Sequence, residues 1–274
     1  MQKISFTTLS TPGLDVPAVA RLARRFGYDG VDLRVSARSG EILPDSKNSE
    51  INAIRDVLSS EGVEAAGLLC YLSFVDLPPR QLTDSLREQM ERQMEIADML
   101  GAQSIRIGGA RSDTRCYAGE LGSALQVVLD KTSGIDIVIQ NHTNDFTAVE
   151  CLTLAKELDH PRFTLAFSPD HCVIMNEDFN AVFPELKGRA RKLFIADIKP
   201  EGGMYETVLP GLGIVLLRES YEAVGGQDFD GWITFKYEKF WDPKLEGPEV
   251  SLPYFIDRAP MWYDGWKKLQ KRAH

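Results

Sequence analysis

Cysteine and histidine are scarce in this sequence, which has only four of each among its 274 residues. The cysteines lie far apart, and no two form a Cys-x-x-Cys pair; they are Cys70, Cys116, Cys151 and Cys172. Zinc fingers and disulfide frameworks need closely spaced or paired cysteines, so this distribution argues against both. We therefore expect reduced thiols and a cytoplasmic protein.

Basic residues and long apolar runs are also in short supply. The 31 lysines and arginines are outnumbered by 40 aspartates and glutamates, which gives a formal charge of −9. Binding to nucleic acid or to an anionic membrane needs clustered cations, so we expect neither partner. No apolar run approaches the ~18 residues of a membrane-spanning helix. The first residues, MQKISFTTLSTPG, lack the basic and apolar segments of a secretory signal.

What the sequence does contain is a repeated rhythm of short β-rich runs and helical segments. Glycine just past a helix end adopts a left-handed conformation at low steric cost, so it marks a helix stop before a strand. Glycines in this position are Gly27, Gly62, Gly101, Gly134, Gly188 and the pair Gly225-Gly226. Together with residues 3–9 and the run FTLAFS, they define eight β-rich runs. Helical spacing of apolar residues predicts helices near 15–26, 51–58, 81–100, 117–132, 147–158, 178–187 and 212–224.

The alternation of strands and helices fits either an open doubly wound sheet or a closed barrel. Eight units, and the absence of a GxGxxG motif after the first strand, favour the barrel. No linker or break in composition divides the chain. We predict the α/β class, as a single (β/α)8 TIM-barrel domain over residues 1–274, with a C-terminal extension helix in the aromatic tail from Ser251.

Polar residues stand where several of the apolar runs end. In a TIM barrel, function resides at the C-terminal ends of the strands, which we call the barrel mouth. The candidates there are Arg106, Gln140, His142, Asp170, His171, Asp197, Lys199, Lys236 and Glu238. Residues two apart on a strand share a face, so Lys236 and Glu238 point the same way. Polar residues at the same end of five strands indicate a functional mouth, and no P-loop, GxSxG or HExxH motif competes with it.

Six motifs follow one another along nearly the full chain: GYDGVDLR, LGAQSIRIGGA, IVIQNH, SPDH, ADIKP and GWITFKYEKFWDP. In this order and spacing they resemble the xylose isomerase-like TIM barrel superfamily, which includes sugar phosphate isomerases and epimerases. The resemblance implies a small sugar-like substrate and assembly into homo-oligomers. It also implies a divalent cation held by Glu, Asp, His and Glu from the fifth to the eighth strand.

The four implied ligand positions carry other residues in this chain, namely Gln140, Ser168, Asp197 and Lys236, whereas His171, Lys199 and Glu238 match the neighbouring motif positions. A charged lysine cannot coordinate a metal, and its charge replaces the electrostatic role of the cation. We therefore expect no metal at the family site and no other cofactor, with Lys236 salt-bridged to Asp197. A shifted site for Mn²⁺, Mg²⁺ or Zn²⁺, built from Asp170, His171, Asp197 and Glu238, stays open as an alternative.

Three functions are compatible with these residues. The first is a carbohydrate isomerase or epimerase, or a related dehydratase or lyase, that works by acid/base proton transfer. Its catalytic residues are His171, Lys236 and Glu238, and its substrate-binding residues are Arg106, Gln140, His142, Asp197 and Lys199. The second is a catalytically degenerate barrel that binds a sugar or a partner. The third is a Schiff-base aldolase, in which Lys199 lies near Lys236 and favours its neutral amine.

Overall fold

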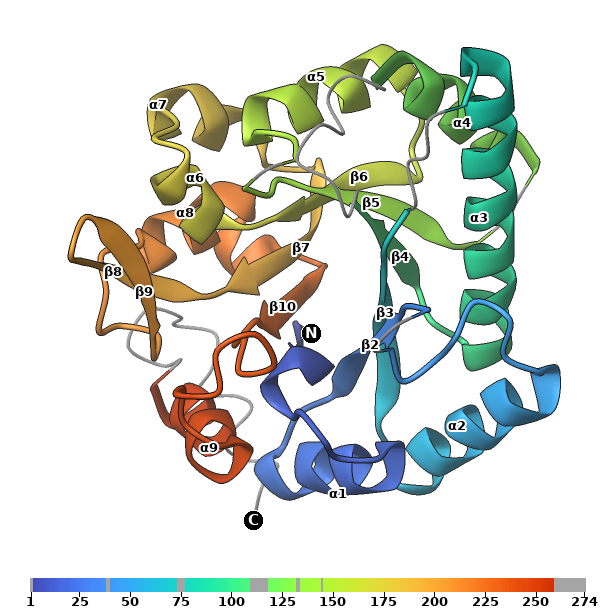
Figure 1. Ribbon diagram of the computed structural model, residues 1–274. Coiled ribbons are helices and arrows are strands. Elements are labelled where there is room, and N and C mark those ends of the chain that lie inside the picture. The colour runs from blue at the N-terminus through green and yellow to red at the C-terminus, as the bar shows by residue number, and fades with distance from the viewer. Residues whose placement is uncertain are drawn as a thin grey trace.

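In the computed structural model, eight parallel strands close into a barrel with helices around its outer surface (Figure 1). The structure describes residues 2–37, 40–72, 77–108, 118–131, 134–143 and 145–258. The barrel strands are β1 (Lys3–Thr7), β2 (Gly30–Val35), β3 (Glu64–Cys70), β4 (Ser104–Ile107), β5 (Asp136–Gln140), β6 (Phe163–Phe167), β7 (Ala190–Ile195) and β10 (Trp232–Phe235). Their order around the barrel is β1-β10-β7-β6-β5-β4-β3-β2, closed by pairing of β1 with β2. The predicted (β/α)8 TIM barrel is confirmed.

Helices connect the strands and pack against the outer face of the barrel. They are α1 (Val16–Phe26), α2 (Asn48–Ser60), α3 (Pro79–Leu100), α4 (Ala118–Lys131), α5 (Ala148–Leu158), α6 (Pro169–Ile174), α7 (Phe179–Val182), α8 (Leu217–Val224) and α9 (Pro248–Arg258), with short 3-10 turns at Thr8–Ser10, Phe183–Glu185 and Gly226–Asp228. Their ends follow the expected chemistry: Asp15 accepts a hydrogen bond from Ala18 N at the start of α1, and Gly27 ends it with φ of 77°. No helix of the described residues is both long and apolar enough to cross a membrane.

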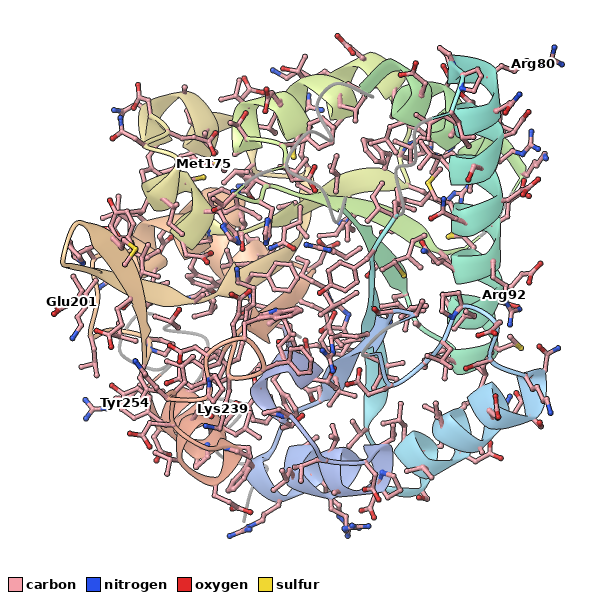
Figure 2. All side chains as sticks on the ribbon, viewed as in Figure 1. Arg80, Arg92, Met175, Glu201, Lys239 and Tyr254 are labelled. Carbon is pink, nitrogen blue, oxygen red and sulfur yellow. The ribbon has the colours of Figure 1, made fainter. Side chains whose placement is uncertain are left out.

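The structure departs from the sequence-based boundaries after β7. The chain there forms an antiparallel hairpin, β8 (Asp197–Glu201) and β9 (Met204–Val208), which is separate from the barrel sheet. Figure 2 shows Glu201 of this hairpin at the outer edge of the molecule. The helix expected over 212–224 begins only at Leu217, and the one expected over 178–187 is the short α7 followed by a 3-10 turn.

The C-terminal extension helix is present as α9, which lies beside α1 in Figure 1. The Tyr28 hydroxyl, which follows α1, donates to the carbonyl of Leu252 in α9 at 2.9 Å. Tyr28 also stacks on Phe255 of the same helix, with ring centroids 6.2 Å apart. These contacts attach α9 to the amino-terminal part of the barrel. The rest of the expected aromatic tail, residues 259–274, and Cys116 lie outside the described residues.

Inside the barrel, an apolar layer separates two polar levels. The layer consists of Leu69, Val138, Ala166 and Phe194, with Leu9 above them. Because all strands are parallel, inward residues that precede this layer lie toward the amino ends and those that follow it lie at the mouth. The lower level contains Ser5, Asp32, Lys192 and Thr234, and the upper level contains Arg34, Arg106, Gln140, Ser168 and Lys236.

Candidate active site

A buried cluster around Lys236 occupies the barrel mouth. Lys236 directly follows β10, and its side chain is only 4% exposed. Its Nζ donates to Asp170 Oδ2 at 2.9 Å and lies 2.9 Å from His171 Nε2. Glu238 Oε1 lies 3.7 Å from the same nitrogen. One ammonium group therefore joins the last barrel strand to the start of α6.

The charges of the cluster are fixed by burial and by Lys236. Burial disfavours the charged form of Asp170, but the Lys236 ammonium more than offsets this and holds the pKa of that carboxyl below its ordinary value. Burial, and then the charge of Lys236, lower the pKa of His171 well below its ordinary value. At neutral pH Asp170 is consequently a carboxylate and His171 a neutral imidazole.

Both ring nitrogens of His171 have polar neighbours. Nε2 lies 2.9 Å from Lys236 Nζ. Nδ1 lies 2.7 Å from Thr143 Oγ1 and accepts from the Thr143 backbone amide at 3.3 Å. The ring of His142 lies beside that of His171, with centroids 4.2 Å apart. Burial, followed by the charges of Arg106 and Lys236, lowers the pKa of His142 to about 4.

A second group of side chains extends across β4, β5 and β6. Arg106 Nε donates to Gln140 Oε1 at 2.5 Å, and Gln140 Nε2 donates to Ser168 Oγ at 3.0 Å. Asn141 fixes the next segment, because its amide both donates to the Ser168 carbonyl and accepts from the Ser168 amide, each at 2.8 Å. This chain of hydrogen bonds ends two residues before Asp170 and so connects Arg106 to the Lys236 cluster.

Arg34 of β2 is a mouth residue to which the sequence analysis gave no role. Its Nε and Nη2 donate to Glu41 Oε1 at 3.3 and 2.9 Å, and its guanidinium lies 4.1 Å from the ring centroid of Phe240. Glu41 also accepts from Thr8 Oγ1 at 2.7 Å. The signal in the sequence was the alternation of Asp32 and Arg34, two charged residues on one face of an apolar strand.

The structure places Asp197 and Lys199 away from the Lys236 cluster. The Asp197 carboxylate accepts four backbone amides, those of Ile198, Gly211, Gly213 and Val215, at 2.8 to 3.1 Å. The expected salt bridge between Lys236 and Asp197 is wrong, because Lys236 pairs with Asp170 and Glu238 instead. The expected proximity of Lys199 to Lys236 is also wrong: Lys199 lies on the hairpin, half-exposed, and pairs with Glu206 at 3.1 Å.

A separate ion pair lies in the lower level of the barrel. Lys192 Nζ donates to Asp32 Oδ1, and Ser5 Oγ donates to Asp32 Oδ2 at 2.7 Å. Ser5 also lies 2.8 Å from Thr234 Oγ1. A Cβ at Gly67 would come within 2.9 Å of both Lys192 Nζ and Asp32 Oδ1, so glycine leaves the room that this pair occupies. Lys192 and Asp32 are at most 1% exposed and lie below the apolar layer, so this pair does not reach the mouth.

The four positions that the family resemblance assigns to metal ligands hold a poor ligand set. Gln140 and Ser168 are neutral and form a hydrogen bond with one another. The Asp197 carboxylate already accepts hydrogen bonds from backbone amides. The Lys236 ammonium contacts Asp170 and His171, the carboxylate and imidazole that would otherwise be available to bind a metal ion. A hard divalent cation prefers anionic oxygen ligands, so these residues do not fit one. Among the described residues, no group of three or more His, Cys, Asp and Glu side chains is placed to hold a metal ion.

Comparison with known proteins gives a match over most of the chain. The profile of the family described as "Xylose isomerase-like TIM barrel" matches residues 20–255. No curated protein matches the sequence significantly.

Solved structures resemble the fold at low sequence identity. A D-allulose 3-epimerase from Methylomonas sp. in complex with D-allulose has a TM-score of 0.72 at 16% identity, over 96% of this chain and 97% of that one. The IOLI protein with a zinc atom has a TM-score of 0.74 at 14% identity, over 99% and 98%. The probable 3-DHS dehydratase AsbF from Bacillus anthracis has a TM-score of 0.68 at 15% identity, over 99% and 100%. At these identities the likeness shows the fold.

Proposed function

Because the chain belongs to the xylose isomerase-like TIM barrel family, we propose that it is a carbohydrate isomerase- or epimerase-like enzyme, or a related sugar dehydratase or lyase. The observation that carries the proposal is the buried contact of Lys236 with both Asp170 and His171 at the barrel mouth. A sugar epimerase and a probable dehydratase among proteins of the same fold support this range of reactions. The substrate is a small sugar or sugar derivative.

The proposed chemistry is proton transfer next to a carbonyl group. Glu238 lies 3.7 Å from Lys236 and is about one-third exposed, so it is placed to remove the proton from the carbon beside the carbonyl. The Lys236 ammonium donates to the carbonyl oxygen as negative charge develops there, which stabilises an enediolate. In epimerisation, the proton returns to the other face of the same carbon. In isomerisation, it returns to the former carbonyl carbon, while the hydroxyl proton of the adjacent carbon passes through Lys236 to the former carbonyl oxygen.

His171 and Asp170 keep Lys236 ready for this role. A proton can pass between Lys236 Nζ and His171 Nε2 because these atoms are 2.9 Å apart. The Asp170 carboxylate, 2.9 Å from Nζ, accepts from Lys236 and fixes the position of its side chain. Arg106, Gln140 and His142 lie around this cluster as substrate-binding residues.

The proposal includes action without a metal at the family site. It is supported by the ligand set described above, in which an ammonium stands where an anionic ligand would be needed. Dialysis against EDTA should leave activity unchanged, and elemental analysis of the purified protein should find less than stoichiometric Mn²⁺, Mg²⁺ and Zn²⁺. Loss of activity on dialysis, with recovery on adding one of these ions, would instead establish a shifted site.

The reaction is tested by solvent exchange. The protein is incubated in D₂O with a panel of ketoses, aldoses and sugar acids, and deuterium incorporation at carbon is followed by NMR. Wild-type protein should exchange a carbon-bound proton of at least one compound, and Lys236→Met should not. Lys244→Met, which removes an exposed lysine from the same segment, serves as the control and should retain exchange. Absence of exchange across the panel would contradict the proposal.

Two other functions remain as alternatives in this proposal. A catalytically degenerate barrel is favoured by the altered ligand positions, and it predicts sugar binding without exchange. A Schiff-base aldolase is favoured by the burial of Lys236 at the mouth. It predicts a borohydride-trapped adduct on Lys236 with a keto sugar. The contact of Lys236 with Asp170 favours the acid role, because a Schiff-base lysine must first lose its proton.

Cellular location and assembly complete the proposal. A cytoplasmic location is supported by the described cysteines, Cys70, Cys151 and Cys172, which are buried free thiols. Assembly into a homo-oligomer is proposed from the family alone. Size-exclusion chromatography with light scattering measures it, and a mass of one chain would contradict it.

A further inference from the structure

Two arginines point into the barrel mouth from strands that flank β3. In the strand register, Arg34 of β2 pairs with Leu69 of β3, and Leu69 pairs with Arg106 of β4. The three residues therefore form one row across the sheet, and Leu69 belongs to the apolar layer inside the barrel. With strands ~4.8 Å apart, the Cα atoms of the two arginines are separated by about 10 Å. Both guanidinium groups extend from this row toward the mouth.

Arg106 is buried without a carboxylate partner in the described part of the chain. Its exposed fraction is 6%, and its hydrogen bonds go to the neutral Gln140 amide and, at 3.5 Å, to the Cys70 carbonyl. Its guanidinium carbon lies 5.3 Å from the Tyr71 ring centroid. A buried charge is normally paired, and among the described residues no carboxylate neutralises the positive charge of Arg106.

Arg34 contributes a buried donor that has no hydrogen-bond partner among the described residues. Glu41 holds its Nε and Nη2 on one edge, and the Phe240 ring lies against the guanidinium. The remaining nitrogen, Nη1, is fully buried and has no hydrogen-bond partner among the described residues. A guanidinium fixed in this way loses little freedom when it binds a further acceptor. Arg34 is 5% exposed, so the group is held inside the mouth and not at its rim.

The two arginines and the Lys236 cluster come from different parts of the barrel wall. Arg34 and Arg106 lie on β2 and β4, whereas Lys236 follows β10, and Asp170 and His171 lie in α6.

We propose that Arg34 and Arg106 bind a carboxylate of the substrate, and that the substrate is a sugar acid or a related polyhydroxy carboxylate. Guanidinium groups match the planar, two-oxygen geometry of a carboxylate. This inference rests on the proposed function for the reaction, and it adds the substrate class. The hydrogen-bond chain from Arg106 through Gln140 and Ser168 fixes the anion site relative to Lys236, where proton transfer takes place.

The test measures the affinity of the protein for sugar acids by titration calorimetry, independently of any turnover. Matched compounds are titrated: D-glucuronate, D-galacturonate and D-ribonate against the neutral sugars or polyols, and against the corresponding sugar phosphates. Wild-type protein should bind at least one sugar acid about 10- to 100-fold more tightly than its neutral counterpart. Equal affinity for neutral and acidic members, or tighter binding of the phosphates, would overturn the carboxylate assignment.

Single substitutions of the two arginines test whether they bind the carboxylate. Arg106→Gln and Arg34→Gln should each weaken sugar-acid binding by about 10- to 100-fold. They should change binding of the neutral sugar by less than about threefold, since only the contact to the carboxylate is lost. Arg24→Gln, which removes an exposed arginine of α1, is the control and should bind as wild type. If Arg34→Gln does not fold because Glu41 is left unpaired, the double variant Arg34→Gln/Glu41→Gln removes both charges together.

The two proposals fail in different ways. If the protein binds sugar acids through both arginines but exchanges no carbon-bound proton, the anion site is supported and the proposed reaction is wrong. If the protein exchanges protons of neutral sugars, and Arg34→Gln and Arg106→Gln exchange them equally well, the reaction is supported and the anion site is wrong. Titrations on Glu238→Gln, which keeps both arginines and should fold as the wild type, separate binding from chemistry directly.

Discussion

Lys236 Nζ lies 2.9 Å from Asp170 Oδ2, and both side chains are at most 6% exposed. The two residues come from different βα units, one following β10 and the other in α6. A buried charge pair is costly to break by removing one partner, because the remaining charge keeps its desolvation penalty. The same contact that prepares Lys236 for chemistry therefore also holds the barrel mouth together.

Removing one member of this pair should destabilise the protein strongly. Lys236→Met leaves the Asp170 carboxylate buried without its cation, and we expect the free energy of unfolding to fall by about 3–5 kcal/mol. The double variant Lys236→Met/Asp170→Leu removes both charges and should recover most of this loss. Urea denaturation measures both. Equal stability of the single variant and the wild type would contradict the pairing.

Glu238 should be needed for turnover and unimportant for folding. Its side chain is 31% exposed, so replacement does not bury an unpaired group. Glu238→Gln should reduce kcat by about 10²–10⁴-fold, the usual contribution of a positioned general base. Its unfolding midpoint should stay within the error of the wild-type value. Glu219→Gln on the exposed side of α8 is the control, and a similar kcat for both variants would remove Glu238 from the mechanism.

Stability should decrease as the pH falls from about 6.5 to 4. The pKa of His142 is about 4 in the folded protein, because of burial and then the charges of Arg106 and Lys236, whereas an unfolded histidine titrates near 6.5. Between these values the unfolded chain binds more protons, so stability rises with pH. His142 contributes on the order of 2 kcal/mol above pH 6.5, after allowance for its partial exposure. His171, whose pKa is also lowered, acts in the same direction.

The measurement is urea denaturation at a series of pH values between 4 and 7. His142→Gln should flatten the decrease, because its side chain does not titrate. His160→Gln removes a histidine at the opposite end of the barrel and is the matched control, which should keep the full decrease. A His142→Gln profile that follows the wild type throughout would show that this imidazole does not contribute.

Asp197 should stabilise the loop after the hairpin and not the site itself. Its carboxylate accepts four backbone amides, and a Cβ at Gly213 would collide with it. Asp197→Ala should cost at least about 2 kcal/mol, since several buried N–H groups lose their acceptor. It should also accelerate hydrogen exchange at Gly211 and Gly213. Glu206→Gln, which breaks the exposed pair with Lys199, should cost less than about 1 kcal/mol.

The sequence was sufficient for the barrel and for part of the mouth. Glycine after several helices and the run of eight short strands indicate the topology, because these local signals agree with the closed sheet. Gln140 and Lys236, which the strand ends suggested as mouth candidates, are both buried in the structure. It failed after β7, where ADIKP reads as a strand end but forms the first strand of a separate hairpin.

The partners of the charged residues were not predictable from one sequence. Asp197 and Asp170 both follow apolar strands, and only the local turn decides which one reaches Lys236. The loop at Gly211 and Gly213 folds back and supplies amides to Asp197, a contact across 14 to 16 residues that no periodicity reports. Arg34 was overlooked because its partner Glu41 lies in a loop, and pairing across a loop leaves no pattern.

The apolar layer of Leu69, Val138, Ala166 and Phe194 separates the polar network in the lower half of the barrel from the one at the mouth. The Lys192–Asp32 network and the Lys236 cluster share no residue and no hydrogen bond across the described structure. Changes in the free energy of unfolding at independent sites add, so each end can be redesigned separately. Exchanging the lower ion pair for apolar residues of similar volume is often stabilising. A more stable lower half would let directed evolution alter the substrate preference of the upper half without unfolding the protein.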